Sequence, residues 1–78
     1  MTSFDKNNFI RSYKEGMEQS REIIKSFSDN KHFLDIAIKD TENKIERIKQ
    51  NNEYKELNDF VIQELTELLQ YAKSLKKE

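Results

Sequence analysis

Residues 12–20, SYKEGMEQS, hold the only glycine of the chain, Gly16, and the chain contains no proline. Whether Gly16 ends a helix or lies inside one decides how many helices the chain forms. Around it, residues of one helix face recur at intervals of three and four, namely Ile10, Tyr13, Met17, Ser20, Ile24 and Phe27. The spacing keeps its phase across the glycine, and none of the three residues after it is of a type that caps a helix start. We therefore predict that Gly16 lies inside one continuous helix.

A glycine inside a helix destabilises it by about 1 kcal/mol relative to alanine. Two explanations for Gly16 stay open at this point. The glycine is either tolerated without a structural role, or it admits the backbone of another helix where a side chain would clash. Alanine at this position stabilises the protein in the first case and destabilises it in the second.

Two further segments show helical spacing. The first contains Leu34, Ala37, Ile38, Thr41, Ile45 and Ile48, and the second contains Tyr54, Leu57, Val61, Leu65, Leu68, Ala72 and Leu75. The junctions SFSDNK (26–31) and KQNNEY (49–54) are rich in residues that accept N-cap or left-handed backbone geometry. We predict helices at about 3–27, 29–50 and 52–76, with Thr2 and Asp5 forming a capping box at the start.

Short junctions between helices of similar length predict an antiparallel three-helix bundle, all-α, in a single domain spanning residues 1–78. The alternative is a helical hairpin that completes its core by dimerisation. With 35% hydrophobic and 37% charged residues and a net charge of -1, the chain suits a narrow core beneath a solvated surface. The predicted core is a coiled-coil-like seam of Ile10, Tyr13, Met17, Ile24, Phe27, Leu34, Ile38, Ile45, Ile48, Leu57, Val61, Leu65, Leu68 and Leu75.

The chain offers little to catalysis. It has no cysteine, so disulfides and thiolate metal sites are excluded. Its single histidine, His32, lies between Asp29 and Asp35, but three such residues in a chain this charged do not make a ligand set. Phosphate-binding glycine loops and nucleophile–histidine–acid sets are absent from the sequence. We expect no enzyme activity, no cofactor and no metal.

The apolar and charged patterns of the sequence lead to expectations about location and partners. No apolar run approaches the roughly 18 residues that span a bilayer, and the first residues lack the apolar core of a secretory signal. We therefore expect a cytoplasmic protein without a membrane partner. Near-balanced charge disfavours nucleic acid, although a basic face of Lys39, Lys44, Arg47 and Lys49 supports an alternative function as a nucleic-acid-associated regulator. Acids at positions 40, 42 and 46 interrupt that face at ion-pair spacing.

The third segment carries an apolar arc of about 200°, which is wider than the usual stripe of a surface helix. Phe60, Glu64, Glu67 and Tyr71 line one edge of it, and Phe33 and Ile36 lie off the seam of the second segment. These six residues are the predicted protein interface. The competing interpretation is that the first and second helices cover both edges of the arc. We predict a non-catalytic protein–protein interaction module that regulates or inhibits a partner protein and forms homo-oligomers.

Overall fold

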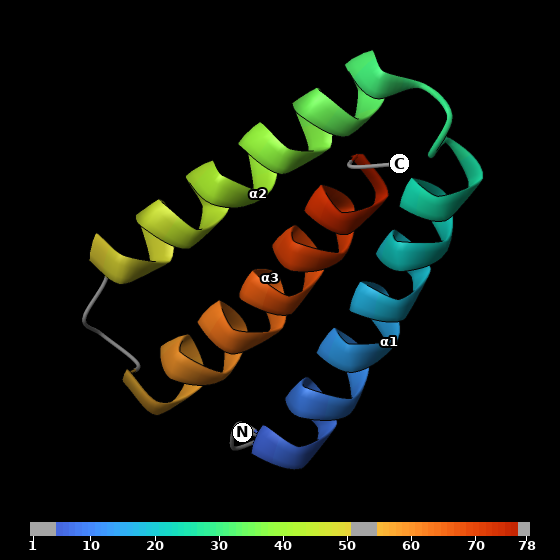
Figure 1. Cartoon of the computed structure of the whole chain (residues 1–78). Helices are drawn as coiled ribbons and strands as arrows, with labels where there is room; N and C mark the ends of the chain where they lie inside the picture. The colour runs from blue at the N-terminus through green and yellow to red at the C-terminus, as the bar shows by residue number, and fades with distance from the viewer. Residues whose placement is uncertain (1–4, 51–54, 77–78) are drawn as a thin grey trace.

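Three helices build the protein. The computed structural model describes residues 5–50 and 55–76, and its helices are α1 (Lys6–Ser26), α2 (Lys31–Gln50) and α3 (Lys55–Lys76). The described residues contain no strand. Each helix runs antiparallel to the one before it, and α3 lies between α1 and α2 in the view of Figure 1. The predicted antiparallel all-α bundle of three helices is confirmed.

Side-chain caps set where the first two helices begin. Asp5 is the N-cap of α1, and its Oδ1 accepts a hydrogen bond from the backbone N–H of Asn8 at 3.2 Å. Asn30 does the same for α2, where its Oδ1 accepts from the N–H of Phe33 at 3.0 Å. Both helices therefore start two to three residues later than predicted, because in each segment a residue later than the first eligible one forms the cap.

The predicted starts of the first and third helices involve residues that the structure does not describe. The predicted capping box made Thr2 the cap and Asp5 the third residue of the helix, and this is wrong, since Asp5 is itself the cap. Thr2 lies outside the described residues. The predicted start of the third helix at residue 52 also lies outside them, and the described part of α3 begins at Lys55.

The core consists of two clusters, and α3 contributes to both. One contains Ile24, Leu34, Leu68 and Ala72, and the other contains Ile45, Val61 and Leu65. The remaining predicted core residues are half-buried, with the exception of Phe27. Thr41 is also buried, and its hydroxyl donates to the carbonyl of Ala37 at 2.8 Å, so it needs no partner outside its own helix.

The assignment of Phe27 to the core is wrong, because its side chain is 50% exposed. Phe27 follows the last residue of α1 and is the C-cap, with φ -111° and ψ 23°. Its side chain therefore leaves the row that faces α3. It packs instead against Phe33 of α2, with ring centroids 5.0 Å apart.

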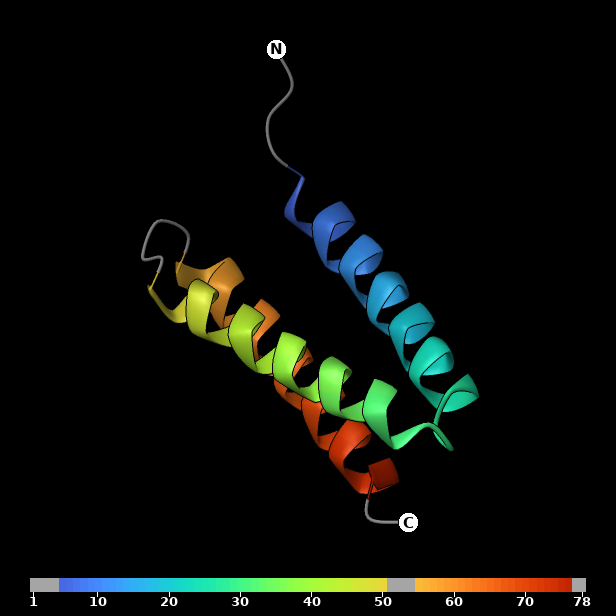
Figure 2. The same cartoon turned by 90° about the horizontal axis from the view of Figure 1, so that it is seen from above.

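The bundle is open on one side. α3 packs against both other helices, whereas α1 and α2 scarcely touch each other. Figure 2 shows α1 apart from α2 along most of its length and near it only at the turn that joins them. The faces of α1 and α2 that are turned toward one another are therefore not closed off by a direct helix–helix contact.

Gly16 lies inside α1, as predicted, without positive φ. Among the described residues, a Cβ atom at this position would meet no atom within 4 Å apart from the adjacent residues and the local helix backbone. Within residues 5–50 and 55–76, no other helix backbone approaches Gly16 closely, so the explanation by close packing against another described helix of the chain is wrong.

We expect Gly16→Ala to raise the free energy of unfolding by about 1 kcal/mol, because alanine is the better helix former and meets open space. In a chain of this size the melting temperature rises by about 4–8 °C for each kcal/mol. Thermal unfolding followed by circular dichroism at low protein concentration measures the change. A lower melting temperature than that of the wild type contradicts the expectation.

Candidate protein-binding surface

The predicted edge of α3 is packed against α1. The ring of Phe60 stands edge-on to Tyr13, with centroids 5.8 Å apart, and edge-on to Phe9 at 6.5 Å. Phe9 and Tyr13 stack on each other at 5.8 Å. These three rings belong to the half-buried shell around the second core cluster. Phe60 is thus part of the contact that holds α1 onto α3.

The other residues of that edge have partners in the chain as well. The carboxylate of Glu67 lies 3.4 Å from the guanidinium of Arg21 in α1. Tyr71 is half-buried against the first core cluster, and Glu64 is half-buried beside Tyr13. These contacts favour the competing interpretation, in which α1 and α2 cover both edges of α3. Association through this edge stays a prediction, and the free apolar surface lies elsewhere.

Burial raises the pKa of the Tyr13 hydroxyl above its usual value, and the nearby Glu64 carboxylate raises it further. An unfolded chain loses this proton more readily, at a pH of about 10. We therefore expect the free energy of unfolding to decrease as the pH rises above about 10. Below that pH, Tyr13 is protonated in both states and adds no pH dependence to stability. Denaturant unfolding of wild type and Tyr13→Phe at about pH 9 and about pH 11 measures this, and equal pH dependence of the two proteins contradicts it.

The exposed apolar residues gather where α1 meets α2. Ile23 and Ile36 are each 54% exposed, Phe27 is half-exposed, and the half-buried Phe33 contacts Phe27 and precedes Ile36 by three residues on α2. We call Ile23, Phe27, Phe33 and Ile36 the apolar corner. Single exposed apolar residues are ordinary, but contiguous ones mark contact surfaces.

Helix periodicity and the short turn bring these four residues together. Ile23 and Phe27 are four residues apart on α1, and Phe33 and Ile36 are three apart on α2, so each pair shares a helix face. The turn between the helices is held by a hydrogen bond from the Asn30 N–H to the Phe27 carbonyl at 3.0 Å. The contact between the rings of Phe27 and Phe33 joins the two pairs.

The sequence predicted only half of this surface. Phe33 and Ile36 were identified because they lie off the seam of their helix. Ile23 was missed since it adjoins the seam residue Ile24, and Phe27 was assigned to the core. The signal for Ile23 was its place four residues before Phe27, on a row of α1 that does not point at α3.

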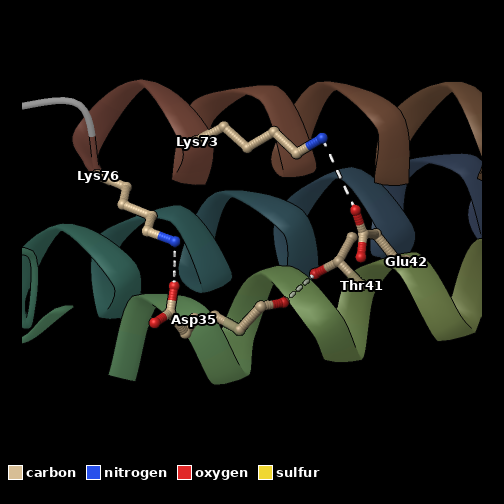
Figure 3. Close-up of polar contacts among 6 residues, drawn as sticks. Asp35, Thr41, Glu42, Lys73 and Lys76 are labelled. Carbon is tan, nitrogen blue, oxygen red and sulfur yellow. Dashed lines mark hydrogen bonds and ion pairs between the residues drawn. The ribbon is translucent and has the colours of Figure 1, made fainter. Parts of the chain in front are cut away.

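Two charged pairs connect α2 and α3 on the side of their contact that faces away from α1. The ammonium of Lys73 lies 3.7 Å from Glu42, and Lys76 pairs with Asp35. Figure 3 shows both pairs bridging α2 and α3, with α1 behind them. Exposed pairs of this kind contribute about 0–1 kcal/mol each. They leave this flank charged and hydrated, in contrast to the apolar corner.

The alternative basic face does not form a single surface. Lys44 pairs with Asp40 at 3.3 Å. At about 100° per residue, Lys39, Lys44, Arg47 and Lys49 spread over about 220° of α2. Side chains so widely spread cannot all face one nucleic acid strand, and a nucleic-acid function stays an alternative that this geometry does not favour.

The residues weighed for acid–base or metal chemistry do not converge. His32 and Asp29 are exposed, and Asp35 pairs with Lys76. Within residues 5–50 and 55–76, no group of three or more potential metal ligands comes together. Among the same residues, no helix has the length and apolar character that crossing a membrane requires.

Comparison with other proteins adds no identity, since no family model, curated protein or solved structure matches this chain.

Proposed function

We propose that the protein is a non-catalytic protein-binding module and that the apolar corner is its contact surface. The observation that carries the proposal is the cluster of large apolar side chains, three of them half-exposed, where α1 meets α2. A module without a catalytic set acts by occupying its partner, as a regulator or an inhibitor. A cytoplasmic location belongs to this proposal and rests on composition alone.

The corner has the makeup of a binding hot spot. Aromatic side chains dominate binding energy where they are central and fully desolvated on association. Phe27 and Phe33 already contact each other, so little side-chain freedom is lost when a partner covers them. Ile23 and Ile36 extend the apolar area on either side. A partner with a complementary apolar patch would therefore bind here through burial of these four side chains.

A charge placed at the corner tests the proposal. Ile36→Glu should abolish partner binding, because it forces a carboxylate into an apolar contact. Gln70→Glu is the matched control. It adds the same negative charge at an exposed position on α3, outside the apolar corner. Each tagged variant is used to capture proteins from an extract of the source cells, with quantitative mass spectrometry.

We expect one partner to be captured by the wild type and by Gln70→Glu, and to be lost with Ile36→Glu. Circular dichroism of the three proteins should agree, because Ile36 lies outside both core clusters. Identical captures by all three proteins contradict the proposal.

A further inference from the structure

One face of α1 carries no charge. It comprises Ser12, Gly16, Gln19, Ser20, Ile23, Ser26 and Phe27. At about 100° per residue these residues cover about 120° of the helix. From residue 11 onward every charged residue of α1 lies outside this arc. Over the whole chain 37% of residues are charged, so an uncharged strip of this length is a pronounced departure from the rest of the surface.

This uncharged face points toward the open side of the bundle. Phe27, at its end, contacts Phe33 of α2, whereas Arg21, on the other side of α1, reaches Glu67 on the outer edge of α3. α2 does not cover the face, because Ile23 is half-exposed and the space beyond Gly16 is open. Figure 2 shows the separation of α1 from α2 along this stretch. Absence of charge is the compositional mark of the centre of a protein interface.

We propose that a second copy of this chain covers the uncharged face, with the two α1 helices packed antiparallel about a two-fold axis near position 18. Such an axis sets each residue opposite the one that lies equally far on the other side of the midpoint. With the axis between positions 17 and 18, Ile23 of one copy meets Ser12 of the other, and Gly16 meets Gln19. Large residues face small ones, and the glycine lets the two helices approach closely.

Self-pairing suits this face because it opposes no like charges, which otherwise penalise the contact of identical surfaces. The net charge of -1 also gives two copies little mutual repulsion. The exposed apolar area can be compared with the area that a stable dimer needs. An aromatic side chain carries about 150–250 Å² and an isoleucine less, so Ile23, Phe27 and Ile36, each half-exposed, offer at most roughly 300 Å².

A standard interface buries about 800 Å² per partner, so the apolar corner alone is too small for a stable dimer. Residues 12–27 extend the contact by about 22 Å along α1. The dimer rests on the proposed function to the extent that both use the apolar corner. A dimer in which each corner is covered by the other copy would compete with any further partner.

Sedimentation velocity over a wide range of protein concentration tests the dimer. We expect the wild type to associate into dimers that dissociate on dilution. Ile23→Glu should weaken the dimer at least tenfold by burying a carboxylate. Gly16→Leu should weaken it as well by holding the helices apart, although leucine is a better helix former than glycine. Gln70→Glu should associate like the wild type.

Cross-linking locates the axis. The chain has no cysteine, so Gln19→Cys carries a single thiol beside the proposed axis, and Gln70→Cys carries one at an exposed position on another helix, α3. A short bismaleimide should link two Gln19→Cys chains and leave Gln70→Cys chains unlinked.

A wild type that stays monomeric at the highest concentration overturns the dimer, as does a dimer that cross-links equally at both positions. If the wild type is monomeric while Ile36→Glu still loses its captured partner, the proposed function stands and a different protein covers the face. If the wild type dimerises and no partner depends on Ile36, the proposed function fails and the dimer stands.

Discussion

Leu34→Ala is expected to lower the free energy of unfolding by about 2–5 kcal/mol. Leu34 is 0% exposed and lies in the cluster with Ile24, Leu68 and Ala72, where it joins all three helices. Alanine leaves a cavity that closely packed helices fill only in part. Because a small domain has only about 5–15 kcal/mol of stability, the variant should unfold at much lower urea concentration. Urea unfolding followed by circular dichroism measures the difference.

Ile36→Ala is the matched control for this change. It removes a side chain of the same volume from the same helix, two residues later, but from a half-exposed position. At low protein concentration we expect a loss of less than about 1 kcal/mol, as for most surface substitutions. Equal losses for the two variants would show that α2 does not turn its Leu34 face toward α3.

Phe60→Glu is expected to detach α1 and unfold the protein, or to leave it with greatly reduced helicity. The carboxylate enters a half-buried cluster formed by the rings of Phe9 and Tyr13, whose apolar surfaces solvate a charge poorly. Burying an unpaired charge is among the few single changes that remove several kcal/mol, about 2–5 or more. Circular dichroism at 222 nm and the urea midpoint measure the loss.

Phe27→Glu is the control for the aromatic cluster. Phe60 packs against the beginning of α1, whereas Phe27 lies at the end of α1, where its ring is half-exposed. The same substitution, phenylalanine to glutamate, is made at both positions. We expect Phe27→Glu to keep the helicity of the wild type while losing association through the apolar corner. A Phe60→Glu protein that remains fully helical and only changes its association would restore the interface that the sequence predicted on the edge of α3.

The helix count could be predicted because the periodic spacing is strong and passes Gly16 unbroken. The exact starts could not, since Ser28, Asp29 and Asn30 are all eligible caps by residue type, and only the structure shows that Asn30 accepts the hydrogen bond from the N–H of Phe33. Phe27 shows the same limit at the other terminus. Periodicity extends to it, but the helix ends one residue earlier and the side chain turns away from α3.

The interface could be predicted only in part, for a geometrical reason. The width of an apolar arc shows how much of a helix is covered, but not what covers it. α3 lies between the other two helices, so both of its edges are used within the chain. The exposed surface is on α1 and α2, which meet only at their turn. Its signal in the sequence is the uncharged row of α1, which hydrophobic spacing alone passes over.

The central claim is that the apolar corner contacts protein in the cell, and site-specific photo-cross-linking tests it most directly. A photoreactive phenylalanine replaces Ile36 in one strain and Gln70 in another, both at exposed positions. After irradiation of living cells, we predict a discrete adduct from position 36, with a second copy or with another protein, and none from position 70. No adduct from position 36, or the same adducts from both positions, would contradict the account.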